Sequence, residues 1–163
     1  DRLEEVRRER GAAFVHPFDD PLTLAGAGTT GLEIMQDLPG ADVVIVPVGG
    51  GGLMAGVATA VKEMSPRTCV VAVELEAGPG LKPALQAGRP VPVARPKDTL
   101  ADGMTPPFVG AIPLEIARRC VDEVVAVSEA EIKDAMRLLI TRAKLYVEGS
   151  GAAATAALLA RRV

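Results

Sequence analysis

Short apolar runs alternate along the chain with longer segments in which apolar residues recur at helical spacing. Runs typical of strands lie at 12–16, 43–48, 69–74 and 123–127, and the segments between and after them predict helices at 29–38, 53–64, 79–87, 113–120, 129–144 and 152–162. The run VVIVPV at 43–48 is apolar without interruption, which is typical of a strand covered on both faces. This order predicts an α/β fold with three layers, in which helices cover both faces of a mostly parallel sheet.

Both ends of the chain interrupt this alternation. Residues 1–10 have the pattern of the last turns of a helix that Gly11 ends, and the alanine-rich helix at 152–162 is followed by no strand. We therefore expect a domain that is truncated at both ends. Residues 1–11 are expected to be the end of a helix from a missing N-terminal part, and residues 12–163 an incomplete α/β domain.

Four consecutive glycines, Gly49 to Gly52, lie between the strand at 43–48 and the helix that begins near Leu53. Ligands of open α/β sheets bind at the carboxyl ends of the strands, where this run lies. Backbone N–H groups and the positive end of a helix favour an anion at such a place, and side chains would keep phosphate oxygens away from those N–H groups. The run predicts a phosphate site.

The residues leave two kinds of phosphate ligand open. Gly50, Gly52 and Ala55 fit G-x-G-x-x-A, and Glu74 ends the next strand 24 positions after Gly50, as a ribose-binding acid of a dinucleotide site would. A P-loop is excluded, because no Gly-Lys-Ser/Thr follows the glycines and the next lysine is Lys62. A single terminal phosphate fits the pattern equally well.

The composition argues against two classes of partner, nucleic acids and membranes. A net charge of −3, a single tyrosine and no tryptophan argue against a nucleic-acid partner, and no segment is long and apolar enough for a membrane span. We expect a cytoplasmic protein that binds a small molecule. His16, the only histidine, precedes a proline and is expected to be a packed or hydrogen-bonded interior group.

Four segments in this order carry a resemblance: FVHPFDDPLTLAGAGTTGLEI at 14–34, VVIVPVGGGGLMAGVA at 43–58, TLADGM at 99–104 and VEGSGAAATAALL at 147–159. Together they resemble the pyridoxal-phosphate-dependent threonine dehydratase and serine dehydratase/racemase family, of the tryptophan-synthase β-like fold (fold type II). The resemblance covers essentially the whole chain. It implies the central to C-terminal part of the catalytic domain, with 12–163 as its phosphate-binding large domain.

The resemblance assigns roles to individual residues. It implies that the backbone N–H groups of Gly49, Gly50, Gly51, Gly52 and Leu53 hold the phosphate of pyridoxal 5'-phosphate. It also implies that Glu148 lies near the cofactor ring and that the Asp102-Gly103 turn lies beside it. Without the resemblance, Glu148 is a first-turn acid of a helix with Ser150 as N-cap, and Asp102-Gly103 is an ordinary tight turn.

A metal ion is not expected. Glu74 matches a divalent-metal ligand of the racemase branch of the family, but the aspartate that completes that site aligns with Gly80 here.

The Schiff-base lysine of the family lies in a Ser-x-Lys-x-Arg-Gly-Ala segment, which this chain lacks. The five lysines, Lys62, Lys82, Lys97, Lys133 and Lys144, lie in other contexts, so no catalytic residue is assigned here. The implied activity of the complete protein is conversion of L-threonine or L-serine to a 2-oxo acid and ammonia, in a homo-oligomer. We expect the chain alone to be inactive. The alternative is a non-catalytic phosphate- or dinucleotide-binding domain of Rossmann type.

Overall fold

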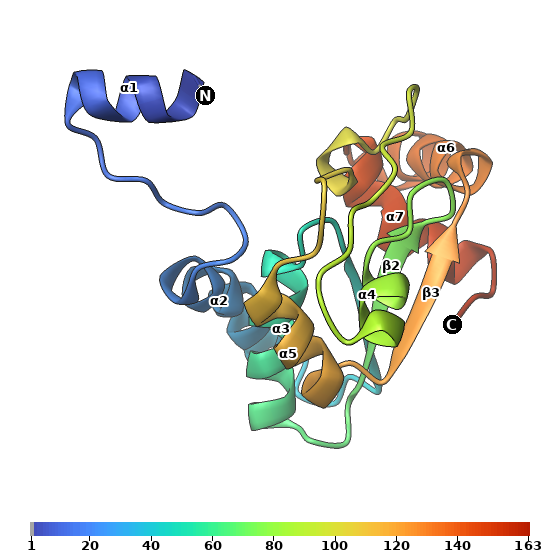
Figure 1. Cartoon of the computed structure of the whole chain (residues 1–163). Coiled ribbons are helices and arrows are strands. Elements are labelled where there is room, and N and C mark those ends of the chain that lie inside the picture. Colours follow the sequence, from blue (N-terminus) through green and yellow to red (C-terminus); the bar gives the residue numbers. More distant parts are fainter. Residues whose placement is uncertain (1) are drawn as a thin grey trace.

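The computed structural model describes residues 2–163, and Asp1 of the first predicted helix lies outside them. Figure 1 shows α1 apart from a body in which helices surround a small sheet. In chain order the elements are α1 (Arg2–Arg10), α2 (Pro21–Asp37), β1 (Val43–Pro47), α3 (Gly52–Met64), β2 (Cys69–Leu75), α4 (Leu81–Ala87), the short 3-10 helix η1 (Asp102–Met104), α5 (Ala111–Cys120), β3 (Glu123–Val127), α6 (Glu129–Leu138), the π turn η2 (Leu139–Ala143) and α7 (Gly149–Leu159).

The sheet is parallel throughout, in the order β1-β2-β3. Val43 lies opposite Cys69, and Val71 lies opposite Glu123. The three strands predicted at 43–48, 69–74 and 123–127 are confirmed within one residue at each end. All three carboxyl ends therefore meet at one edge of the sheet, next to the glycine run.

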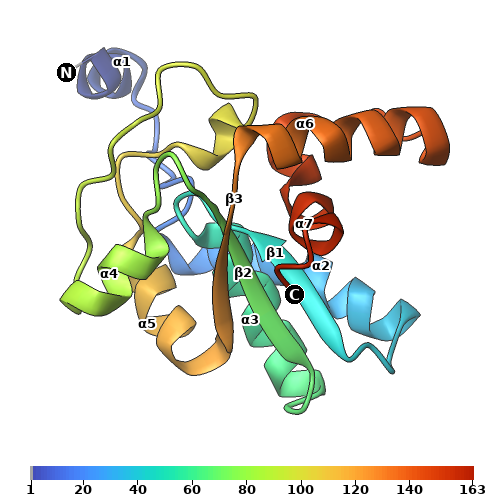
Figure 2. The ribbon, with the colours of Figure 1, turned by 90° about the vertical axis from the view of Figure 1, so that its right-hand side faces the viewer.

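Successive strand residues point into two separate cores. Val70 and Ala72 of β2 pack with α3 and α5, whereas Val73 packs with the alanines of α7. Figure 2 shows the strands between these helices. This alternation puts a helical layer on each face and confirms the predicted three-layer architecture.

The strand predicted at 12–16 is wrong, because no strand pairs with this segment and Val15 is exposed. The next helix, α2, begins about two turns before the predicted Thr29. Asp20 caps it by accepting hydrogen bonds from the N–H groups of Leu22 and Thr23, and Pro21 occupies its first turn. This Asp-Pro start signal is visible in the sequence, but the apolar spacing that located the helix does not include it.

Other predicted boundaries hold. Gly11 ends α1 with a φ of +60°, and Ser128 and Glu131 form the predicted capping box at the start of α6. The long helix predicted to reach Lys144 ends in a π turn, after which Lys144 has a φ of +60°. Among the residues that the structure describes, no helix combines the length and the apolar character that a membrane span requires.

An ion pair between Lys62 and Asp122 lies at the amino ends of the strands, opposite the glycine run. The Lys62 Nζ atom lies 2.6 Å from Asp122 Oδ2 and donates to the Thr68 carbonyl oxygen at 2.8 Å. Partial burial opposes ionisation of Asp122, but the hydrogen bonds from Lys62 and from the Val70 N–H outweigh it and lower the pKa of this carboxyl. Lys62 therefore has a structural role far from the glycine run.

Candidate functional site

A pocket of about 400 Å³ opens at the carboxyl end of β1. It brings together Gly49 to Leu53, Gly103 and Glu148, which the resemblance places at the cofactor, whereas Asp102 is not among the lining residues. The remaining lining residues are Pro17, Phe18, Pro47, Met104, Ser150 and Gly151. Segments that lie about 100 residues apart in the sequence thus form a single site.

The glycine run packs closely against other parts of the chain. A Cβ atom on Gly50 would overlap the Phe18 ring, and one on Gly52 would lie 2.9 Å from the Phe18 backbone. One on Gly49 would lie 2.9 Å from the Gly103 carbonyl oxygen, and Gly51 has a φ of +92°. The expectation that ligand approach alone demands glycine is thus incomplete, because neighbouring protein atoms exclude side chains at these positions.

The backbone N–H groups of the run are free. Gly51 is the N-cap of α3 and has no side chain to cap the helix. Across residues 2–163, the N–H groups of Gly49 to Leu53 have no hydrogen-bond acceptor. Free N–H groups and the positive end of α3 together favour an anion at this place, which makes it a candidate anion site.

Every other α-helix from α2 to α7 has its N-terminal N–H groups bonded to a side chain. Asp20 caps α2, Ser128 caps α6 and Glu148 caps α7. Carboxylates from other elements serve the remaining two: Asp19 accepts from the N–H groups of Ala111 and Ile112 in α5, and Glu74 accepts from those at the start of α4. The α3 N-terminus is the exception, and it is the one that faces the pocket with open N–H groups.

Glu148 lies at the pocket and also caps α7. Its Oε2 accepts from the Ser150 N–H at 2.8 Å and its Oε1 from the Gly151 N–H at 2.7 Å. The alternative in which Ser150 is the N-cap is therefore wrong, because the carboxylate of Glu148 takes these N–H groups. The Ser150 hydroxyl oxygen is buried and has no partner among the described residues.

Glu74 is buried and bonded to backbone N–H groups, so its carboxylate does not face the pocket. The residue is only 2% exposed, and its Oε2 accepts hydrogen bonds from the N–H groups of Gly80, Leu81 and Lys82. Burial raises the pKa of this carboxyl, and the three N–H donors counteract part of the rise. Within the described part of the chain, no cluster of three metal-ligating side chains surrounds Glu74 or any other residue. A ribose-binding or metal-binding role for Glu74 has no support in this geometry.

Phe18 is one of the pocket residues that the sequence patterns did not assign to the site. Its ring packs edge-to-face against His16 at 4.7 Å and Phe108 at 5.5 Å. His16 fixes the turn by accepting, at Nδ1, hydrogen bonds from the N–H groups of Phe18 and Asp19. This confirms His16 as a hydrogen-bonded group. The sequence signal that could have indicated Phe18 is the turn His-Pro-Phe-Asp-Asp-Pro at 16–21, in which Phe18 precedes two aspartates that cap helices.

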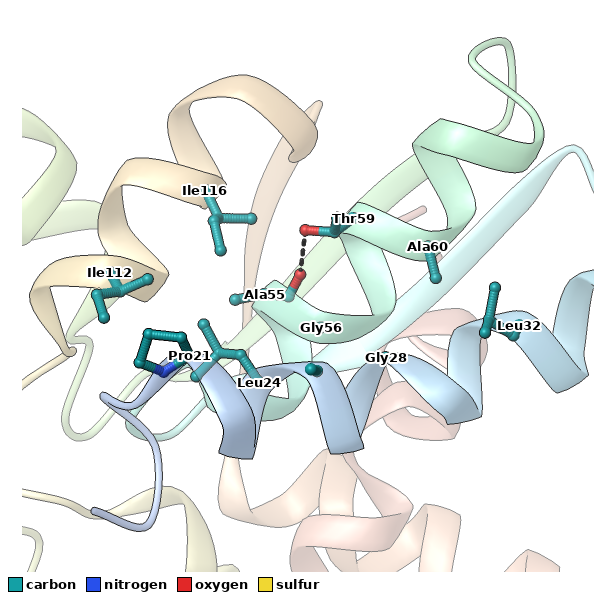
Figure 3. A pocket seen from close by; sticks show the side chains of 11 residues that line it. Pro21, Leu24, Gly28, Leu32, Ala55, Gly56, Thr59, Ala60, Ile112 and Ile116 are labelled. Atoms are coloured by element: carbon teal, nitrogen blue, oxygen red, sulfur yellow. Dashed lines mark hydrogen bonds between the residues drawn. The ribbon is translucent and has the colours of Figure 1, made fainter. Parts of the chain in front are cut away.

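A second pocket, of about 360 Å³, lies between α2, α3 and α5 (Figure 3). Its lining is almost entirely apolar, including Leu24, Ile112 and Ile116. The Thr59 hydroxyl donates to the Ala55 carbonyl oxygen of its own helix at 2.8 Å. This groove offers no group suited to an anion, so the glycine pocket is the candidate site.

Comparison with known proteins identifies the family. The family model described as "Pyridoxal-phosphate dependent enzyme" matches residues 1–163. The L-threonine ammonia-lyase of Geobacter sulfurreducens is 50% identical over 159 residues, which are 98% of this chain and 39% of that protein. Among solved structures, the threonine deaminase of T.th. has a TM-score of 0.93 at 44% identity, over 98% of this chain and 59% of that one. Maize serine racemase has a TM-score of 0.89 at 35% identity, over 96% and 48%.

The chain thus spans between about two fifths and three fifths of the length of these relatives. The family match covers every residue, and the two solved structures superpose on nearly the whole chain. The chain belongs to the family of pyridoxal-phosphate-dependent enzymes.

Proposed function

We propose that this chain is the phosphate-anchoring part of a pyridoxal-phosphate-dependent ammonia-lyase that converts L-threonine or L-serine to a 2-oxo acid and ammonia. The observation that carries the proposal is the start of α3, the one α-helix N-terminus from α2 to α7 whose N–H groups are free. The printed names of the similar proteins, L-threonine ammonia-lyase and threonine deaminase, suggest the reaction.

The pocket residues suit pyridoxal phosphate in three respects. Free N–H groups at Gly49 to Leu53 match a phosphate dianion. The Phe18 ring supplies an apolar wall for an aromatic ligand. Glu148 and the unpaired Ser150 hydroxyl supply polar groups on another wall. One charged end, an apolar face and a few polar contacts are typical of a small cofactor site.

When bound, pyridoxal phosphate supplies an electron sink for reactions at the α-carbon of an amino acid. The residues of this chain hold and orient it. The N–H groups of Gly49 to Leu53 would bind the phosphate, with Phe18 beside it, because the Phe18 ring covers Gly50. Glu148 would face the part of the cofactor away from the phosphate, since its carboxylate repels that group.

The dinucleotide alternative is less well supported. It requires an acid for the ribose hydroxyls, and Glu74 is buried under the start of α4 with its carboxylate taken by three N–H groups. Without that acid, the glycine pattern fits a single phosphate better than a dinucleotide.

Binding is tested by calorimetric titration of the chain with pyridoxamine 5'-phosphate, a cofactor form that lacks the aldehyde and cannot react with lysines. We expect a single site that competes with inorganic phosphate and is weakened in Gly50→Ala. Binding of NAD, with no binding of pyridoxamine 5'-phosphate, would overturn the proposal in favour of the dinucleotide alternative.

Activity is tested on a protein that joins this chain to the segments encoded on either side of it. We expect L-threonine and L-serine to yield 2-oxo acid and ammonia. D-serine formation without 2-oxo acid would point to a racemase instead.

For the chain alone we expect no turnover, since none of its five lysines lines the pocket that the described residues form. A borohydride-stable adduct of pyridoxal phosphate on a single lysine, with turnover, would contradict this expectation.

A further inference from the structure

The hydroxyl group of Ser150 stands out in the candidate site. It is the one buried side-chain oxygen or nitrogen in residues 2–163 that has no hydrogen-bond partner. Its residue lies in the first turn of α7 and lines the same pocket as the glycine run. A buried hydroxyl left unpaired costs about 1–3 kcal/mol, so this position calls for a physical explanation.

The surroundings of Ser150 do not provide a partner. A Cβ atom on Gly103 would lie 2.9 Å from Ser150 Oγ, so the hydroxyl sits against the Cα of Gly103. The Gly103 carbonyl oxygen in turn would lie 2.9 Å from a Cβ on Gly49. Ser150, Gly103 and Gly49 therefore follow one another along one wall of the pocket, with the hydroxyl packed against Gly103.

Glu148 and Ser150 are the only polar side chains among the described residues that line the pocket. Both carboxylate oxygens of Glu148 already accept N–H groups of α7. Ser150 is thus the side chain in this lining that still has a hydrogen to donate. It also lies next to a fixed negative charge, because its own N–H is bonded to Glu148 Oε2.

This charge decides which part of a ligand Ser150 faces. A phosphate dianion is favoured at the free N–H groups of α3 and disfavoured beside the Glu148 carboxylate. The part of the ligand at Ser150 must then be the ring or its substituents. A hydroxyl that donates to an acceptor there would no longer be buried without a partner.

We infer that the Ser150 hydroxyl donates a hydrogen bond to the ring portion of the phosphorylated pyridine bound in this pocket, and so positions the ring relative to the phosphate anchor. The inference rests on the proposed function, because it requires that ligand. Ser150 acts as a positioning residue, and the Ser150→Ala substitution removes the hydrogen bond without disturbing the Glu148 cap, which uses backbone N–H groups.

The test compares Ser150→Ala with wild type by calorimetric titration, using pyridoxamine 5'-phosphate and inorganic phosphate as separate probes. We expect Kd for pyridoxamine 5'-phosphate to rise about tenfold, or about 1.4 kcal/mol, with Kd for inorganic phosphate within about twofold of wild type. In the absence of ligand, Tm should be unchanged or higher, because an unpaired buried hydroxyl has been removed. Ser150→Thr, which keeps the hydroxyl, should bind more tightly than Ser150→Ala.

Two control variants separate a ligand contact from a structural role. Ser128→Ala removes a hydroxyl that caps α6, so it should lower Tm and leave both Kd values unchanged. Thr59→Ala removes a hydroxyl in the apolar groove and should also leave both Kd values unchanged.

Each other outcome overturns the inference in a recognisable way. If Ser150→Ala lowers Tm as Ser128→Ala does and leaves Kd unchanged, the hydroxyl has a structural role. If both probes weaken equally, Ser150 serves the phosphate and the assignment to the ring is wrong. If wild type binds inorganic phosphate but not pyridoxamine 5'-phosphate, the proposed function fails together with the inference.

Discussion

The helices α3 and α7 both begin at the same pocket, but their N-termini differ. The α7 N-terminus is closed by Glu148, whose carboxylate takes the N–H groups of Ser150 and Gly151. The α3 N-terminus begins with glycine, has no side-chain cap and keeps its N–H groups free. Both ends carry the same partial positive charge because of the helix dipole.

This difference makes the two sides of the pocket electrostatically unequal. The carboxylate of Glu148 neutralises the positive end of α7, whereas no side chain of the described residues does so for α3. An anionic group is therefore favoured at one side of the pocket and repelled at the other. The caps on α2, α4, α5 and α6 show that an open N-terminus is not the default in this molecule.

Removing the buried cap of α4 is expected to have the largest effect. Glu74→Ala leaves the N–H groups of Gly80, Leu81 and Lys82 without an acceptor in a buried place. We expect the free energy of unfolding to fall by roughly 3 kcal/mol, measured by chemical denaturation. An effect below about 1 kcal/mol would mean that this cap is dispensable.

The same residue predicts a pH dependence. Because burial raises the folded-state pKa of Glu74, its contribution to stability is greatest while it is protonated and declines as the pH rises from the ordinary carboxyl range through the raised pKa. Glu74→Gln has no such titration. The stability of wild type relative to Glu74→Gln should therefore fall with rising pH, and an opposite slope in paired denaturation series would refute the direction of the shift.

Adding a methyl group at Gly50, next to the uncapped N-terminus of α3, should have the next largest effect. In Gly50→Ala the new Cβ overlaps the Phe18 ring, so the ring or the loop must move. We expect a loss of about 2 kcal/mol in stability and at least a roughly tenfold weaker affinity for inorganic phosphate, measured by calorimetry. Unchanged phosphate binding would show that the anion lies elsewhere.

Opening the closed N-terminus should have a smaller effect. Glu148→Ala removes the cap of α7 and should cost about 1 kcal/mol of stability. Inorganic phosphate should bind about threefold more tightly, because a repelling charge is gone and a second positive helix end is exposed. Weaker phosphate binding in a titration at low salt would contradict the proposal that phosphate is favoured at the α3 N-terminus and repelled by Glu148.

The smallest effect is expected at a glycine without close neighbours. Gly26 lies inside α2, and a Cβ there would meet nothing within 4 Å. Gly26→Ala should therefore raise the free energy of unfolding by about 0.5–1 kcal/mol and leave phosphate affinity unchanged. It is the matched control for Gly50→Ala, and a similar loss in both variants would mean that glycine at 50 is not needed for contact with Phe18.

The sequence was informative where local patterns determine structure. Apolar runs located the strands β1, β2 and β3, and the Ser128–Glu131 pattern located the start of α6. It was misleading at 12–16, where an apolar run resembles a strand but has no partner strand. Pairing is a tertiary property, and a run of five residues does not encode it.

The glycine run, its place after a buried strand and the start of a helix after it follow from the sequence alone, because each depends on neighbours in the chain. The structural roles of the acidic residues do not follow from the sequence alone. Glu74 and Glu148 are both candidate ligand groups in the sequence, and only the folded chain shows that these two residues and Asp19 each satisfy the N-terminus of a helix. The tertiary structure decided this, because Asp19 caps a helix that begins 92 residues later and Glu74 turns back from a buried strand onto α4. No local pattern records which N–H groups such contacts leave free.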